Sequence, residues 1–304
     1  MAKFSGLLRK QIGSIGDLTF KQVNGMTIVS EKITHMTNPR TDAQMRTRTR
    51  WNNIVAMYKG IRPKLNKGFE NKAAGLSDFN MFMKMNMQKE PVYLTKSAVA
   101  GGACVAAPYQ ITQGSLPAIV ITGTNQSGVT DIRLGSLDIT SSTTVAQLAT
   151  KVVENNADYR YGDQISFFLV KQKENEDTGI PYCQFFAAKV VLDPTSEEKL
   201  ADVVNSSHGF ASVDGKLGHS GNDGDCAYCW VHSRKSSGKV LVSSQSLLAA
   251  NSVLAEYQGD AAYNLARSSY GMTDDVFLAP TGDSTNAGTE GGGDDEGGEG
   301  GGGL

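Results

Sequence analysis

The stretch "DQISFFLVKQKENEDTGIPYCQFFAAKVVL" (residues 163–192) contains two apolar runs on either side of the charged loop "KENEDTG". The runs "DQISFFLVKQ" and "YCQFFAAKVVL" are rich in aromatic and β-branched residues, a composition typical of strands. The sequence therefore predicts two strands joined by this loop. A strand such as "QISFFLVKQ" also offers an edge to which a neighbouring chain can pair if nothing covers it.

Further strand patterns surround this pair. "DCAYCWVHSRKSSGKVLVSS" (225–244) predicts a hairpin, and between residues 92 and 140 short apolar runs alternate with Gly, Pro, Asn and Ser. Helical patterns are fewer. They cover 143–156 (capped by Thr143 or Thr144), a short helix after a Thr195/Glu198 capping box and a helix around 245–257. A last helical turn is expected in "AAYNLARSS" (261–269). Residues 91–280 thus predict a β-rich domain, an antiparallel sandwich or barrel-like sheet with two or three helices.

The N-terminal part has a different organisation. "GDLTFKQVNGMTIVSEK" (16–32) predicts a β-hairpin that turns at Asn24-Gly25. A helix is expected over 42–60, and a second over 76–88 with Ser77 as its cap. We expect these helices to form a small unit, with the arginines outside and a core of Trp51, Ile54, Tyr58, Phe79 and Phe82. The expected fold class is α+β, with a first domain over 1–90.

Charge is distributed unevenly along the chain. Residues 1–100 carry 17 Lys and Arg against 6 Asp and Glu, whereas the rest carries 12 against 25. The basic half suits a polyanion, an acidic partner or front-to-back packing of copies. It also suits a solvated helix face with no partner. The candidate contacts for nucleic acid or an acidic partner are Arg40, Arg46, Arg48, Arg50, Arg62, Lys64 and Lys67.

The last segment has its own composition. Residues 282–304 contain 11 glycines and six acidic residues, with no basic or aromatic residue. Such a segment cannot bury enough apolar area to offset the entropy of ordering. We therefore expect residues 281–304 to form a disordered tail.

Motifs that carry chemistry are weak. Cys226 and Cys229 form a C-x-x-C inside a strand pattern, and their offset of three places the two sulfurs on opposite faces. Two buried thiols are therefore favoured over a redox site. A zinc site from His208, His219, Asp223 and this pair would lack a second cysteine knuckle. P-loop, dinucleotide and nucleophile-elbow motifs are absent. We expect no enzymatic activity, metal, cofactor or small-molecule substrate.

The expected cellular location follows from features that the sequence does not contain. No apolar run approaches the roughly 18 residues that span a bilayer, and the first residues do not resemble a secretory signal. Four cysteines do not make a disulfide framework. These features predict a cytoplasmic protein with reduced thiols and no membrane partner.

Several segments resemble a known family. They are "FSGLLRKQIGSIGDLTFKQVNGMTIVSEK" (4–32), "TNPRTDAQMRTRTRWNNIVAMYK" (37–59), "AAGLSDFNMFMKMN" (73–86), "GKVLVSSQSLL" (238–248) and "SSYGMTDDVFLAP" (268–280). Together they resemble an uncharacterised domain-of-unknown-function family of gut anaerobic bacteria and their phages. The resemblance implies a phage or mobile-element context and supplies no catalytic residue.

This context leads to two expectations for function. The first is a non-enzymatic structural or assembly protein of a phage or mobile genetic element. Such a protein would act through self-association or contacts with other structural proteins, and it would be found in the virion or in the cytoplasm of the producing cell. The alternative is a module that binds DNA or RNA with the basic N-terminal helix.

Overall fold

The computed structural model has an α+β fold in which antiparallel sheets predominate. Two compact units make up the described chain, one formed by strands within Met1–Asp42 and one by Ala43–Thr273. The residues that the structure describes are 2–4, 12–23, 26–32, 41–65, 67–73, 75–89, 91–124, 126–204, 209–220 and 224–271.

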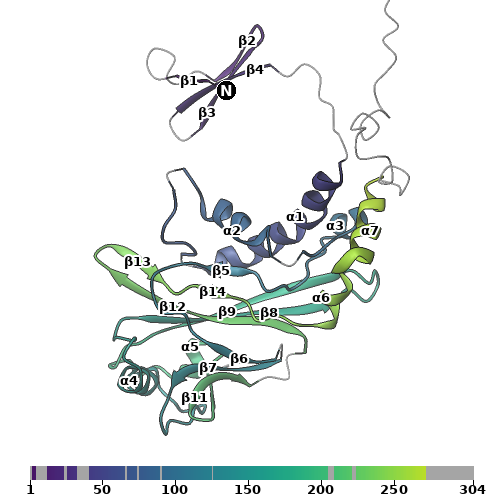
Figure 1. The fold of residues 1–304 in the computed structure, drawn as a ribbon. Helices are drawn as coiled ribbons and strands as arrows, with labels where there is room; N and C mark the ends of the chain where they lie inside the picture. The colour runs from purple at the N-terminus through teal and green to yellow at the C-terminus, as the bar shows by residue number, and fades with distance from the viewer. Residues whose placement is uncertain are drawn as a thin grey trace, which may run out of the picture. The chain divides into compact units, whose positions relative to one another are not determined.

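The first unit contains a four-stranded antiparallel sheet in the order β1-β4-β3-β2 (Figure 1). Its strands are β1 (Ala2–Phe4), β2 (Gly13–Ile15), β3 (Leu18–Val23) and β4 (Met26–Glu31). Strands β3 and β4 pair from Leu18↔Glu31 to Val23↔Met26, which confirms the predicted hairpin. The turn residues Asn24 and Gly25 lie outside the described residues.

The second unit is built around a sheet in the order β13-β12-β8-β9. Its strands are β8 (Gln164–Glu174), β9 (Pro181–Val191), β12 (Cys226–Ser236) and β13 (Lys239–Val242). Strand β8 pairs with β9 along its whole length and with β12 from Gln164↔Ser233 to Lys171↔Cys226. Both predicted strand pairs are therefore confirmed, and they join into one central sheet.

A second sheet lies against one face of the central sheet. It has the order β10-β11-β7-β6, and β5 and β14 form a separate pair. No sheet in the described residues closes into a barrel, so the sandwich alternative describes this region better. These strands are β5 (Gln110–Thr112), β6 (Ile121–Gly123), β7 (Ser127–Arg133), β10 (Ala211–Val213), β11 (Lys216–Ser220) and β14 (Gln245–Ser246).

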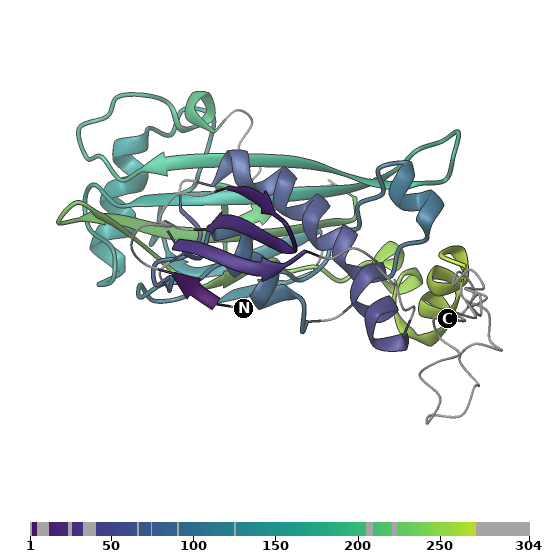
Figure 2. The same ribbon diagram turned by 90° about the horizontal axis from the view of Figure 1, so that it is seen from above.

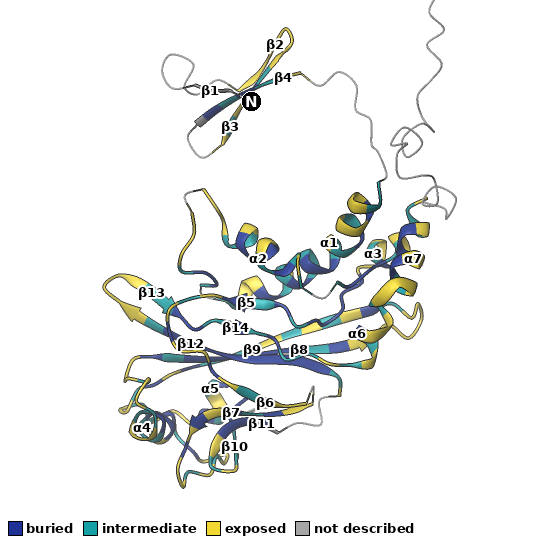
Figure 3. Cartoon of the chain, viewed as in Figure 1, coloured by how far each residue is buried: buried dark blue, intermediate teal, exposed yellow. Residues whose placement is uncertain are grey.

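The two middle strands of the central sheet, β8 and β12, are buried on both faces (Figure 3). Successive side chains of a strand point to opposite sides, so their runs of consecutive buried residues require cover on each side. Phe168 and Val170 of β8 belong to a core shared with the first helices. Phe167 and Leu169 belong to a second core shared with β7, β11 and α4 (Val145–Asn155). The second unit therefore has a helical layer, the central sheet and then the second sheet.

Helices α1 (Asp42–Ile61) and α2 (Asp78–Asn86) form the helical layer, and α1 lies across the long strands when they are seen from above (Figure 2). The short 3-10 helix η1 (Arg62–Lys64) follows α1. Ser77 caps α2 as predicted, since its side chain accepts a hydrogen bond from the backbone N–H of Asn80. The capping box of α4 uses Thr144 and Gln147.

Some predicted elements are wrong in detail. The expected Thr195 capping box does not form, because Thr195 bonds Asp193 instead and α5 (Leu200–Val203) starts after Lys199 without a side-chain cap. The helix expected over 245–257 is shorter, since β14 occupies its start. The described part of 91–280 holds five helices rather than two or three. Besides α4 and α5 they are α3 (Lys96–Ala100), α6 (Ser252–Glu256) and α7 (Gly259–Ser269).

The domain boundary expected at residue 90 does not match the described structure. Helices α1 and α2 share one core with Val105, Phe168 and Cys229, so they belong to the β-rich unit. Gly60 of α1 makes this approach possible, because a Cβ there would overlap the ring of Phe185. The expected helical core is also partly wrong, since Trp51 is 40% exposed. The predicted tail 281–304 lies outside the described residues.

Replacing either of two adjacent phenylalanines tests the two-faced sheet. Phe167 and Phe168 are each 2% exposed but lie in different cores. Phe167→Ala and Phe168→Ala should each lower the free energy of unfolding by roughly 3–5 kcal/mol. Val120→Ala, at a side chain that is 58% exposed, should cost less than about 1 kcal/mol. Urea titration measures the free energy of unfolding of all three variants. If only one of the two buried phenylalanines gives a large loss, the sheet is not buried on both faces.

Candidate functional site

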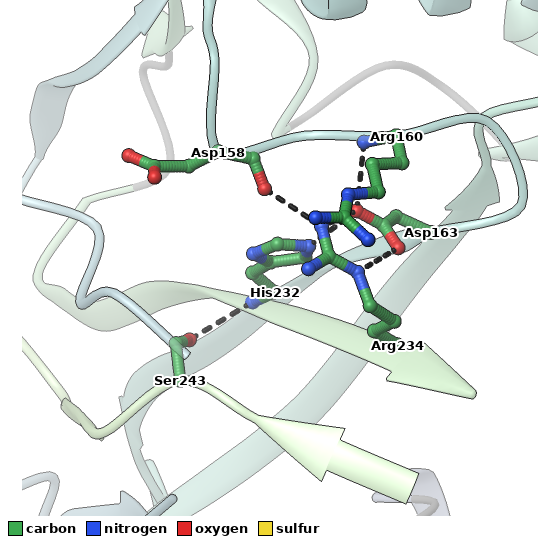
Figure 4. A network of polar contacts seen from close by, with 6 residues as sticks. All are labelled: Asp158, Arg160, Asp163, His232, Arg234 and Ser243. Atoms are coloured by element: carbon green, nitrogen blue, oxygen red, sulfur yellow. Dashed lines mark hydrogen bonds and ion pairs between the residues drawn. The ribbon is translucent and has the colours of Figure 1, made fainter. Parts of the chain in front are cut away.

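A buried polar cluster lies where the central sheet begins (Figure 4). Asp163 immediately precedes β8, and His232 and Arg234 project from β12. The Asp163 carboxylate lies 2.8 Å from His232 Nε2 and accepts hydrogen bonds of 2.7 Å from Arg234 Nε and Nη2. It also accepts the backbone N–H of Arg160 at 2.9 Å. Antiparallel pairing of β8 with β12 brings these groups together.

The electrostatics of this cluster favour an ionised carboxylate. Burial of Asp163, whose side chain is 2% exposed, raises its pKa. The hydrogen bonds from Arg234, His232 and the Arg160 backbone outweigh that effect and lower the pKa to about 2. The guanidinium of Arg234 also donates to the backbone oxygen of Asp158 at 2.7 Å. The cluster thus fixes the loop before β8 onto β12.

A polar pocket of about 280 Å³ borders this cluster, with His232 and Tyr159 in its wall. The Tyr159 ring stacks on the His232 imidazole with centroids 4.4 Å apart. Burial, followed by the carboxylates of Asp131, Asp158 and Asp163, raises the pKa of the Tyr159 hydroxyl. The tyrosine therefore stays protonated at neutral pH and serves as a hydrogen-bond donor or acceptor.

The cluster is not arranged for nucleophilic catalysis. Ser243, the serine drawn beside His232 in Figure 4, accepts the backbone N–H of His232 at 3.0 Å rather than facing the imidazole. Asp163 is shared with Arg234, so it does not act on the histidine alone. In the described part of the chain, no three His, Cys, Asp or Glu side chains gather as metal ligands. His208 and Asp223 lie outside that part.

The C-x-x-C cysteines lie on opposite faces of β12, as predicted. Cys226 belongs to the core with the second sheet, and Cys229 belongs to the core with the helices. Both are fully buried, and neither is joined in a disulfide. Burial also raises the pKa of the Cys229 thiol. The two sulfurs are therefore separated by the sheet itself.

The predicted basic residues do not gather into one patch. Arg46, Arg48 and Arg50 lie in the first half of α1, whereas Arg62 and Lys64 lie in η1 beyond its end. Sixteen residues of helix between Arg46 and Arg62 correspond to roughly 24 Å. Lys67 follows η1, and Arg40 is outside the described residues. The described candidate residues therefore fall into two groups, one in α1 and one beyond its end.

One arginine of the first group, Arg46, packs against an aromatic ring of another helix. The Arg46 guanidinium lies 4.2 Å from the centroid of the Tyr263 ring, which joins α1 to α7. Arg48 and Arg50 are only partly exposed. The second group is exposed to the same extent, since Arg62 is exposed, as Arg46 is in the first, and Lys64 and Lys67 are intermediate. There, Lys189 of β9 has a lowered pKa because of burial and, next, the charge of Lys64.

The outer strand of the central sheet is the other candidate surface. Strand β9 ends the strand order, so no further strand pairs with its outer side in the described residues. At its two ends the outward oxygens of Pro181 and Val191 already accept the N–H groups of Cys104 and Asp193, so the open part of the edge is Cys183 to Lys189. The β9 side chains Tyr182, Phe186 and Val191 are 36%, 45% and 49% exposed. An 11-residue edge strand with exposed aromatic groups is unusual in a monomeric protein, because natural edges are generally short or charged.

The strand "QISFFLVKQ" that the sequence suggested as an edge is not one. It is β8, and both of its sides are paired. Sequence reasoning missed β9 as the edge and missed the Asp163–His232–Arg234 cluster. Strand order is not encoded in any local pattern, and 69 residues separate Asp163 from His232.

Comparisons of the chain with protein-family models, curated proteins and solved structures found no match. None of the helices in the described residues combines the length and apolar composition that crossing a membrane requires. The candidate surfaces are accordingly defined by geometry alone.

The pH dependence of stability tests the polar cluster. Because the pKa of folded Asp163 is about 2, below its ordinary value of 3.8, its contribution is present above about pH 4 and is lost as pH falls through 2. Asp163→Asn should lower the free energy of unfolding at neutral pH by about 2–4 kcal/mol. It should also flatten the decline of stability between pH 4 and pH 2.

The matched control is Asp177→Asn, which removes an exposed carboxylate from the β8–β9 turn. Its acid profile should follow that of the unmodified protein. If Asp163→Asn keeps the full acid decline as well, the cluster does not hold the carboxylate ionised. Thermal unfolding followed by circular dichroism across pH measures these profiles.

Proposed function

We propose that this protein is a non-enzymatic structural or assembly component of a phage or mobile genetic element, and that it associates with a second copy through strand β9. The open central part of this edge, around the exposed Phe186, is the observation that carries this proposal. The phage context rests on the sequence resemblance. The polar cluster supports the non-enzymatic part, since its groups are engaged with one another.

The hydrogen bonds at the two ends of β9 define which backbone groups face outward. The N–H of Asn175 donates to the oxygen of Ile180, and the N–H of Leu192 donates to that of Asp163. Even-numbered residues of β9 therefore face β8, since the ladder alternates. The odd-numbered residues direct their N–H and C=O groups away from the sheet. Cys183, Phe185 and Ala187 are the central ones.

An antiparallel pair of β9 strands is self-complementary about the middle residue, Phe186. Around that two-fold axis, Phe185 lies opposite Ala187 of the other copy, and both residues have outward backbone groups. Phe186 lies opposite its own counterpart at a non-hydrogen-bonded position, where side chains approach most closely. The two exposed rings then cover each other. Such an isologous contact forms a closed dimer.

Proline at adjacent positions separates association from folding. Ala187→Pro removes an outward N–H, so it should leave the β8–β9 ladder intact and convert dimers to monomers. Ala188→Pro removes an inward N–H of that ladder and should destabilise the fold itself. Light scattering gives the mass of each variant, and circular dichroism gives its melting temperature.

Salt dependence separates this contact from other arrangements. A dimer formed by backbone hydrogen bonds and Phe186 should persist as ionic strength rises, whereas front-to-back electrostatic packing should dissociate or form larger species. An unmodified protein that is monomeric at every concentration, or a dimer that survives Ala187→Pro, contradicts β9 pairing. Absence of its peptides from purified phage particles contradicts the assembly role.

A second candidate function, nucleic-acid binding, is favoured by the group at the end of α1. Lys64 lies near enough to Lys189 to affect its pKa, and Arg62 is exposed beside them. Like charges held together repel, and phosphate groups relieve that repulsion while releasing counterions. This group is about 24 Å from Arg46, so a bound strand would follow α1 to reach both.

Charge reversal tests this alternative. Arg62→Glu with Lys64→Glu should weaken binding to any sequence and reduce the salt slope by about one for each phosphate that is no longer neutralised. The control is Lys235→Glu with Lys239→Glu, which reverses two exposed charges on the β12–β13 hairpin. Fluorescence anisotropy with labelled DNA and RNA measures both. Equal losses in the two double variants would indicate a nonspecific charge effect, and no binding at low salt would exclude the alternative.

A further inference from the structure

Two cysteines outside the C-x-x-C motif meet beside the start of β9. Cys104 follows α3, and Cys183 is the third residue of β9. The Cys183 thiol donates to the backbone oxygen of Cys104 at 3.2 Å, so the Cys183 sulfur lies directly beside the Cys104 backbone. Both cysteines are free.

The backbones that carry these cysteines are held together independently of the thiols. The N–H of Cys104 donates to the oxygen of Pro181 at 2.9 Å. Gln172 of β8 joins the same two segments. Its Nε2 donates to the oxygens of Cys104 (3.2 Å) and Tyr182 (3.0 Å), and its Oε1 accepts the N–H of Ala106 at 2.8 Å. These bonds hold the backbone of Cys104 beside the start of β9, so the two cysteines stay neighbours whether or not their sulfurs are joined.

We propose that Cys104 and Cys183 form a reversible disulfide when a small-molecule disulfide reaches them. Cys183 is the entry point, since it is half-buried whereas Cys104 is 6% exposed. Cys226 and Cys229 do not compete, because the central sheet separates them. The bond would close a long loop and fasten the segment after α3 to β9.

The chemistry is thiol–disulfide exchange and is balanced. Cys183 loses its proton, and its sulfur attacks the oxidant RSSR, which forms a mixed disulfide and releases one RS⁻ that is protonated to RSH. Cys104 then loses its proton and attacks the Cys183 sulfur, so the second RS⁻ leaves and is likewise protonated. The two cysteines lose two electrons and two protons, and RSSR becomes two RSH.

The environment also sets the rate. The hydrogen bond with Cys104, followed by burial, raises the pKa of the Cys183 thiol well above its usual range. The thiolate is the attacking species, so the reaction is slow at neutral pH and accelerates in alkali. A pair of this kind stays reduced through brief exposure to oxidant and responds to a sustained one.

Oxidised glutathione applied to the folded, full-length protein tests the proposal. Titratable thiols in denaturant should fall from the four free cysteines to two, and the chain mass should fall by two hydrogens. Peptide mapping without reduction should recover one cross-link, between Cys104 and Cys183. The melting temperature should rise by several degrees and return after treatment with dithiothreitol.

Variants provide the controls. Cys226→Ser with Cys229→Ser should still form the cross-link, whereas Cys183→Ser should retain all of its remaining thiols. Because the mapping on the unmodified protein does not depend on any variant, a misfolded mutant cannot obscure the result. Four thiols persisting after prolonged alkaline oxidation, a stable glutathione adduct without a cross-link, or a cross-link between other cysteines would overturn the proposal.

Discussion

Burial of one sheet on both of its faces is the constraint on which the rest of the structure depends. Six consecutive residues of β8, from Ile165 to Val170, are buried, and most of β12 is buried beside it. Alternate side chains enter different cores, so no face of these strands is left for water. The helical layer and the second sheet are each required, because removing either would expose half of the apolar residues on these strands.

A buried carboxylate and a buried amide lie at the two ends of β8, and both are hydrogen-bonded. At one end Asp163 lies against His232 and accepts hydrogen bonds from Arg234 and a backbone N–H. At the other end Gln172 bonds the segment after α3 and the start of β9. A buried polar group without partners would cost roughly 1–3 kcal/mol, which explains why each end recruits its partners from distant parts of the chain. These two anchors hold the loop before β8 and the segment after α3 in place.

Local patterns in the sequence predicted the elements whose signals are local. The pair Asn24-Gly25 predicted a hairpin, and Ser77 predicted the start of a helix. The odd spacing of Cys226 and Cys229 predicted that they lie on opposite faces of a strand. The partners of those elements could not be predicted this way. Nothing near Ile54 shows that α1 packs on the central sheet rather than in a separate helical unit.

The candidate surfaces show the same limit. The basic residues are visible in the sequence, but their division between the two ends of α1 follows from helix length and from the stacking of Arg46 on Tyr263. Phe185 and Phe186 are adjacent in the sequence but differ in cover. Gly60 of α1 lies against the ring of Phe185, whereas Phe186, on the other face of β9, is exposed. The identity of the edge strand is a property of the whole sheet and has no local signal.

The order of strands along the chain has a consequence for synthesis on the ribosome. Strand β9 follows β8 after a short turn, so this pair can form as soon as residue 191 has emerged. Strand β12, which completes the other side of β8, emerges 35 residues later. During that interval β8 presents an apolar, unpaired side to the surroundings. A nascent chain that ends between β9 and β12 therefore exposes apolar surface and an unpaired strand side, the two features that favour misassembly.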